Sequence, residues 1–190
     1  MKYKGLQIYD IVFDEDSIFQ NVAIVSEPAI EETFIQLSKE EMPVQLKLDE
    51  ERRVVSGPVL IPDQPIYRNM GGKQFYIRFS KETIEKMAVD FFEKHRNTEG
   101  NVEHAIPVQD ITYFESYLLN KERGISPVEF SSLPDGTWIM SAKVNNEDVW
   151  QLIKDGELTG FSIDVSKVSF KEEKEIDNLQ DFLDYLKKNR

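Results

Sequence analysis

The chain has 190 residues and a formal net charge of -12 at pH 7, with 35 acidic against 23 basic side chains. Such a charge repels phosphate backbones and anionic membranes, so we expect neither nucleic acid nor a membrane as a partner. The absence of cysteine excludes thiolate nucleophiles, disulfides and thiol-ligated zinc, and we expect no metal and no cofactor.

The length suggests one domain with a core of its own, over residues 1–170. No run of about 18 apolar residues is present and the first residues lack the apolar core of a signal peptide, which predicts a soluble, intracellular protein. Strands are predicted where apolar residues alternate, at 6–13 and 18–25, within an N-terminal segment 1–37. An exposed polar linker is predicted at about 38–43.

The middle of the chain has a strongly β character from Val44 onward. An apolar run at 54–61 is interrupted by a Gly-Pro step that predicts a bulge or bend, and residues 70–73 predict a hairpin turn. A second hairpin is predicted between 127–132 and 137–144. Short strands with bends and bulges in succession suggest a curled or closed sheet.

Ser80 is placed to cap the clearest helix in the sequence. Apolar residues recur behind it at helical spacing and predict a stripe that faces the core: Ile84, Met87, Ala88, Phe91 and Phe92. His95 follows near the end of this helix, where an imidazolium suits the C-terminal dipole. For such a histidine a partly exposed capping role is more common than a catalytic one.

The other histidine, His104, lies in a segment without helical periodicity. It leads into residues 110–119, a long predicted strand with apolar residues on both faces, which is typical of a central strand. Glu115 lies inside this strand and is conspicuous, because a carboxylate is rarely buried without a partner.

A second helix is predicted to start after Asn145 or Asn146 and to end at Gly156, with Glu147 and Asp148 in its first turn. The strand predicted after Gly160 alternates, with apolar residues on one face (Phe161, Ile163, Val165) and polar residues on the other (Ser162, Asp164, Ser166). The apolar phase then slips, which predicts a bulge near residues 166–167. A charged spacer and an amphipathic helix, which we expect to pack on the domain, make up residues 171–190.

His104, Glu115 and Ser162 together form the inventory for nucleophilic catalysis. In such a set the imidazole takes the hydroxyl proton while the acid fixes the tautomer and stabilises the imidazolium. Any β protein of this size contains some histidine, serine and glutamate, so the plain alternative is that Ser162 is an ordinary serine on a solvent-facing strand position.

The order and surroundings of these residues resemble the phage prohead maturation proteases. Ser162 follows His104 by 162 − 104 = 58 residues and lies in Gly160-Phe161-Ser162-Ile163, after a helix, a glycine and a short turn. The closest resemblance is to the XkdF-type phage serine proteases, over roughly residues 20–170. It includes the segments 25–30, 55–62, 66–68, 75–80, 101–104 and 115–116.

The resemblance implies an α+β, herpesvirus-assemblin-like fold: a closed, mostly antiparallel β-barrel flanked by helices. It also implies a serine endopeptidase that works without a cofactor inside the phage procapsid, in the host bacterial cytoplasm. Its implied partners are the scaffold and the major capsid protein, which it cleaves as substrates during head maturation, and further copies of itself in a homo-oligomer. On this resemblance Ser162 matches the nucleophile and His104 the general base.

The third member of the site is open between two carboxylates. We predict Glu115, because it lies in the strand after His104, and Asp164 is its rival, because it shares a strand face with Ser162. A second histidine is the other arrangement among relatives, and the position of His95 on a helix disfavours it.

Two rival functions remain at this point. One is a catalytically inactive barrel module that interacts with capsid or scaffold. The other is a serine esterase for small acyl substrates, which is disfavoured because Asp164 stands where the Gly-x-Ser-x-Gly motif requires its second glycine. If the protein is a protease, we expect autocleavage in the exposed polar stretches 38–51 and 171–177.

Overall fold

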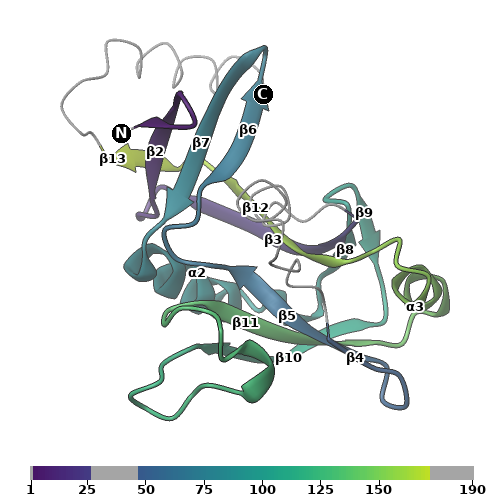
Figure 1. Cartoon of the computed structure of the whole chain (residues 1–190). Helices are drawn as coiled ribbons and strands as arrows, with labels where there is room; N and C mark the ends of the chain where they lie inside the picture. Colours follow the sequence, from purple (N-terminus) through teal and green to yellow (C-terminus); the bar gives the residue numbers. More distant parts are fainter. Residues whose placement is uncertain (1, 27–46, 172–190) are drawn as a thin grey trace.

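The computed structural model describes residues 2–26 and 47–171 of the chain (Figure 1). The predicted linker at about 38–43 and the predicted C-terminal helix lie outside the described residues, as do most of the two stretches proposed for autocleavage. No helix of the described part is long and apolar enough to span a membrane.

The described residues form a mostly β fold with three open sheets and two α-helices. The first sheet has the order β1-β2-β7-β6, with β13 also paired to β2: Lys2–Tyr3, Leu6–Val12, Lys73–Phe79, Ile66–Met70 and Ser169–Lys171. The second has the order β10-β11-β5-β4: Ile111–Leu118, Trp138–Val144, Val54–Leu60 and Lys47–Asp49. The third has the order β12-β3-β8-β9: Gly160–Ser166, Ile18–Val25, Gly100–Val102 and Ile106–Val108.

The prediction of a closed, mostly antiparallel barrel of the herpesvirus-assemblin type is therefore wrong. Two strand pairs, β2 with β7 and β3 with β8, are parallel, and within the described residues no ladder joins one sheet to the next. The closest approach to closure is β12, which lies against β5 without pairing to it. The first half of β5 is already paired with β4, and the second half contains Pro58, which has no N–H to donate to a ladder.

Both helices form where the sequence predicts them. In α2 (Lys81–Glu93) the Ser80 hydroxyl accepts the Thr83 N–H at 3.2 Å, and in α3 (Glu147–Lys154) the Asn146 side chain accepts the Val149 N–H at 3.1 Å. Gly156 follows α3 with a φ of 74°. The described part also contains two short 3₁₀ turns, η1 (Arg96–Thr98) and η2 (Val128–Phe130).

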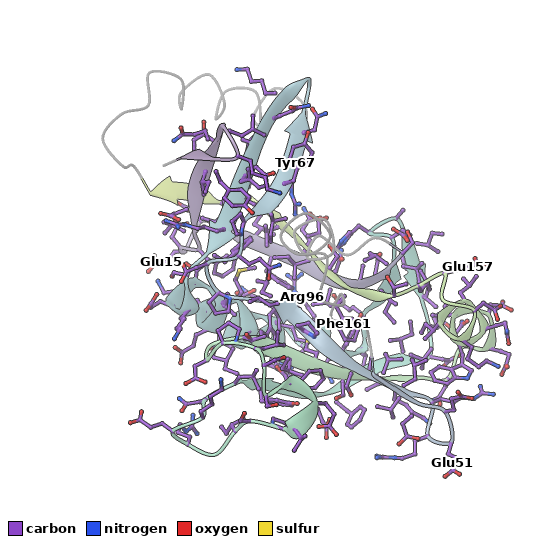
Figure 2. The ribbon with its side chains drawn as sticks, viewed as in Figure 1. Glu15, Glu51, Tyr67, Arg96, Glu157 and Phe161 are labelled. Carbon is purple, nitrogen blue, oxygen red and sulfur yellow. The ribbon has the colours of Figure 1, made fainter. Side chains whose placement is uncertain are left out.

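The main core is an aromatic cluster that links α2 to the second and third sheets. Its members are fully buried and meet edge to face or tilted, with ring centroids 5.6 to 6.1 Å apart: Phe19, Phe91, Tyr113, Trp138 and Phe161. Figure 2 shows Phe161 pointing into this core beneath β12. The Tyr113 hydroxyl donates to the buried Val22 carbonyl at 2.9 Å, so a hydrogen bond as well as packing joins β3 to β10.

Two strand predictions in the second sheet are corrected. The strand containing Glu115, β10, is not central but lies at the edge of its sheet, where β11 is its partner strand among the described residues, and both Phe114 and Glu115 are exposed. Residues 127–132 do not form a hairpin with β11, which pairs with β10 and β5 instead. Phe130 and Leu133 pack in the second core with three other buried side chains: Ile61, Leu119 and Ile139.

Candidate functional site

Ser162 lies on the polar face of β12, as its alternation predicts. Ser162 is opposite Ala23 of β3, and Asp164 is opposite Asn21. Side chains directly opposite one another on paired strands share a face, so these four residues form one surface, here called the Ser162 face. The alternate residues of β12 pack against the core: Phe161, Ile163 and Val165. A bulge is present, but its register shift falls between Asp164 and Val165, two residues before the predicted position; Lys167, which follows β12, has a φ of 52°.

His104 reaches the same surface from the other side of β3. Ile24 of β3 pairs with Val102 of β8, and the turn from β8 to β9 carries Glu103, His104 and Ala105. This hairpin is tight, because a Cβ on Gly100 would lie 2.5 Å from the Val108 carbonyl oxygen. The turn therefore brings His104 beside β3, one strand away from β12.

The backbone of this turn is held in an unfavourable conformation. Glu103 and His104 both have a φ of 55°, in the left-handed region where a side chain costs roughly 1 to 2 kcal/mol per residue. The Ala105 N–H donates to the Val102 carbonyl at 3.2 Å and closes the turn. Such strain persists only where surrounding contacts determine the conformation.

The imidazole of His104 is oriented by Asn21. The distance between His104 Nδ1 and Asn21 Oδ1 is 2.9 Å. An amide oxygen only accepts, so Nδ1 carries the proton and Nε2 keeps its lone pair. Asn21 and Ala23 lie two residues apart on β3, which places Ser162 roughly 8 Å from Asn21 between Cα atoms, given usual strand spacings. His104 and Ser162 thus flank one strand on one face.

Three charged groups act on His104, which is half buried. Burial is the largest cause of a pKa below the ordinary value for histidine; Asp164 and then Glu103 raise this pKa, and Arg68 lowers it. The net result is a neutral imidazole near pH 7, the form that accepts a proton. Among the described residues the Ser162 hydroxyl, also half buried, has no hydrogen-bond partner.

Glu115 lies in the second sheet and has other partners. Its carboxylate accepts the Ser141 hydroxyl at 2.5 Å, and Ser141 Oγ lies 2.7 Å from Ser56 Oγ. Because the single Ser141 proton points to Glu115, Ser56 must donate to Ser141. We call this chain of three side chains the Ser56 row. Glu115 is not among the charges that act on His104.

His95 is exposed at the end of α2 and takes a left-handed conformation, with a φ of 57°. Its backbone N–H donates to the Phe92 carbonyl at 3.0 Å. Within the described residues no group of three or more histidine, aspartate or glutamate side chains could hold a metal ion.

Sequence reasoning did not find Asn21, Glu103 or Arg68. Each acts on His104 from a different strand or turn: Asn21 from β3, Arg68 from β6 and Glu103 from the turn after β8. A weak signal for Asn21 was present, since it is polar in an apolar strand. Its relation to Asp164 depends on the strand register, which one sequence does not reveal.

A comparison with protein families finds a match. The model of the family described as "Putative phage serine protease XkdF" covers residues 41–172, which include His104, Glu115, Ser162 and Asp164. Asn21 lies outside the matched range. No curated protein and no solved structure matches the chain.

Proposed function

Because the chain belongs to this XkdF family of phage serine proteases, we propose that it is a serine endopeptidase that cleaves scaffold and capsid-protein segments during head maturation. The observation that carries the proposal is the hydrogen bond from His104 Nδ1 to Asn21, on the face that also presents Ser162 and Asp164. It leaves a neutral imidazole nitrogen available as a base on the same face as a serine whose hydroxyl has no partner within residues 2–26 and 47–171.

In the proposed mechanism Ser162 Oγ attacks the carbonyl carbon of the scissile peptide bond. His104 Nε2 takes the hydroxyl proton and then gives it to the leaving amine, and a water molecule activated by the same nitrogen releases the acyl group. Asn21 keeps the imidazole in the required tautomer. The Asp164 carboxylate, which raises the pKa of His104, stabilises the imidazolium that forms.

β8 and β12 pair with opposite edges of β3, so the proposal requires the side chains of His104 and Ser162 to meet over this strand when the substrate is bound. Catalytic hydrogen bonds are often long in free enzymes and tighten when substrate is bound. Glu115, predicted as the third member, is the alternative acid, and its bond to Ser141 favours Asp164 in its place.

The family supports a wider set of proposals about the setting. The protease would act inside the procapsid in the host bacterial cytoplasm, as a homo-oligomer, with scaffold and major capsid protein as substrates. It would also cleave itself in the polar stretches 38–51 and 171–177, as exposed and unpaired backbone is what proteases cut. Incubation of pure protein followed by mass spectrometry tests this, and fragments must depend on Ser162.

A fluorophosphonate reagent tests the catalytic claim directly, because it reacts with a serine only where a base activates the hydroxyl. We expect the intact protein to be labelled at Ser162, as mapped by peptide mass spectrometry. Ser162→Ala should abolish the label and the cleavage of scaffold and capsid protein. Ser166→Ala is the matched control, since Ser166 lies on the same strand and accepts a hydrogen bond from Gln20.

The same experiment distinguishes the protease from the catalytically inactive module that the sequence leaves open. An absence of labelling in the intact protein, together with unchanged capsid processing in a phage carrying Ser162→Ala, would assign the chain to that class.

A further inference from the structure

The turn that carries His104 is fastened to the end of β3 by Glu103. The Glu103 N–H donates to the Ile24 carbonyl at 3.2 Å, and its carboxylate accepts the Ser26 N–H at 2.6 Å. The same residue therefore both donates to and accepts from the backbone of β3. A hydrogen bond to a carboxylate is charge-assisted and is stronger than one between neutral groups.

The segment before Ser162 is fastened to the same place. The Thr159 N–H donates to the Val25 carbonyl at 2.8 Å, and the Thr159 hydroxyl donates to the Ser26 carbonyl at 2.8 Å. Ser26 is thus bound on its N–H by the residue next to His104 and on its carbonyl by a residue three positions before Ser162. We call Glu103, Ser26 and Thr159 the Ser26 clamp.

We propose that the Ser26 clamp sets the position of His104 relative to Ser162, and that Glu103 is a positioning residue of the protease. This inference rests on the proposed function for its effect on activity. Its physical reason is that two adjacent left-handed residues do not hold that conformation by themselves, and the Glu103 contacts supply the restraint. Without the restraint, His104 Nδ1 would leave Asn21 Oδ1 and the tautomer would no longer be fixed.

The test compares Glu103→Ala with Glu103→Gln in the full chain. Both substitutions remove the negative charge that raises the pKa of His104, so this electrostatic effect is common to the two variants. Only glutamine keeps a side-chain oxygen that can accept the Ser26 N–H. Any difference between the variants therefore reports the hydrogen bond and not the charge.

The first readout is the nitrogen NMR spectrum of the two imidazoles, with exposed His95 as an internal reference. We expect a single Nδ1–H tautomer of His104 in the parent and in Glu103→Gln, and a mixture of tautomers in Glu103→Ala. The second readout is the rate of fluorophosphonate labelling at Ser162. It should fall by about 10-fold to 100-fold in Glu103→Ala, the effect of moving a catalytic group by about 1 Å, and stay within a few-fold of the parent rate in Glu103→Gln.

Glu122→Ala is the control, because Glu122 is an exposed acid in the loop between β10 and β11. Should Glu103→Ala fail to fold, Thr159→Val against Thr159→Ser asks the same question from the other side of the clamp. A single tautomer in Glu103→Ala, or equal losses in Glu103→Ala and Glu103→Gln, would overturn the proposal. The NMR result does not require activity, so a clamp that controls the tautomer in a chain that never labels would refute the protease and leave the clamp intact.

Discussion

Two polar surfaces of this molecule contain the same kinds of residue in different states. The Ser56 row crosses the second sheet, where two serines and a carboxylate are bonded to one another in sequence. The Ser162 face crosses the third sheet, where the serine hydroxyl has no partner among the described residues and a carboxylate lies two positions along the strand. The difference is the imidazole, which reaches only the second of these surfaces.

The comparison separates a structural serine from a candidate nucleophile. In the Ser56 row both hydroxyl protons have an acceptor, and half-buried Ser56 and exposed Glu115 together satisfy the buried Ser141 hydroxyl, whose residue is only 1% exposed. On the Ser162 face the base is present and oriented but not engaged by the hydroxyl. A site that awaits a substrate has this appearance, because its last hydrogen bond forms when the reactants are in place.

The largest effect should come from removing the base. His104→Gln keeps a polar side chain but has no nitrogen that can accept a proton, so the fluorophosphonate labelling rate at Ser162 should fall by at least about 10³-fold. Ser141→Ala removes the centre of the Ser56 row and should keep the rate within a few-fold while lowering the melting temperature. Equal loss of labelling in the two variants would contradict the distinction between the surfaces.

A smaller effect is expected from the charge beside the base. Activity requires neutral His104, so it rises with pH through the pKa of this residue, which lies below the usual value of about 6.5. Asp164 raises that pKa; Asp164→Asn should therefore move the acid limb of the pH profile to lower pH and reduce the maximal rate by about 10-fold. Arg68→Gln should move the limb in the opposite direction, because Arg68 lowers the same pKa. If the acid limb moved in the same direction in Asp164→Asn and Arg68→Gln, these two side chains could not be acting on the pKa of His104 with opposite sign.

Local features of the fold were predictable, because each depends on neighbouring residues alone. Ser80 and Asn146 cap the two helices, and the alternation after Gly160 places Ser162 on a polar face. The twin glycines, Gly71 and Gly72, turn the β6–β7 hairpin with positive φ values of 58° and 84°. In each of these places propensity, periodicity and capping agree.

The arrangement of the strands was not predictable in the same way. Apolar residues on both faces of β10 favoured a central strand, but β10 lies at the sheet edge and Phe114 is 44% exposed, which only the tertiary structure reveals. The closed barrel was implied by the family resemblance and favoured by short strands and bends, which open sheets also contain. Asn21 and Arg68 approach His104 from strands remote in sequence, so no spacing rule could bring them into the site.

The smallest effect on activity is expected at the carboxylate that sequence reasoning preferred. Glu115→Gln keeps an oxygen that can accept the Ser141 hydroxyl, but replaces a charge-assisted hydrogen bond with a neutral one. The free energy of unfolding should fall by about 1 kcal/mol, measured by urea denaturation, since a hydrogen bond to a charged group contributes more than a neutral bond.

The labelling rate at Ser162 and the acid limb of its pH profile should both remain unchanged in Glu115→Gln, because this carboxylate is engaged by Ser141 and is not among the charges that act on His104. Asp164→Asn, measured alongside, shows that the assay can detect the loss of an acid from the site. If the acid limb of the pH profile shifted in Glu115→Gln but not in Asp164→Asn, Glu115 would be the acid that acts with His104 and Ser162. The Ser56 row would then belong to the active site, and the two surfaces would be one.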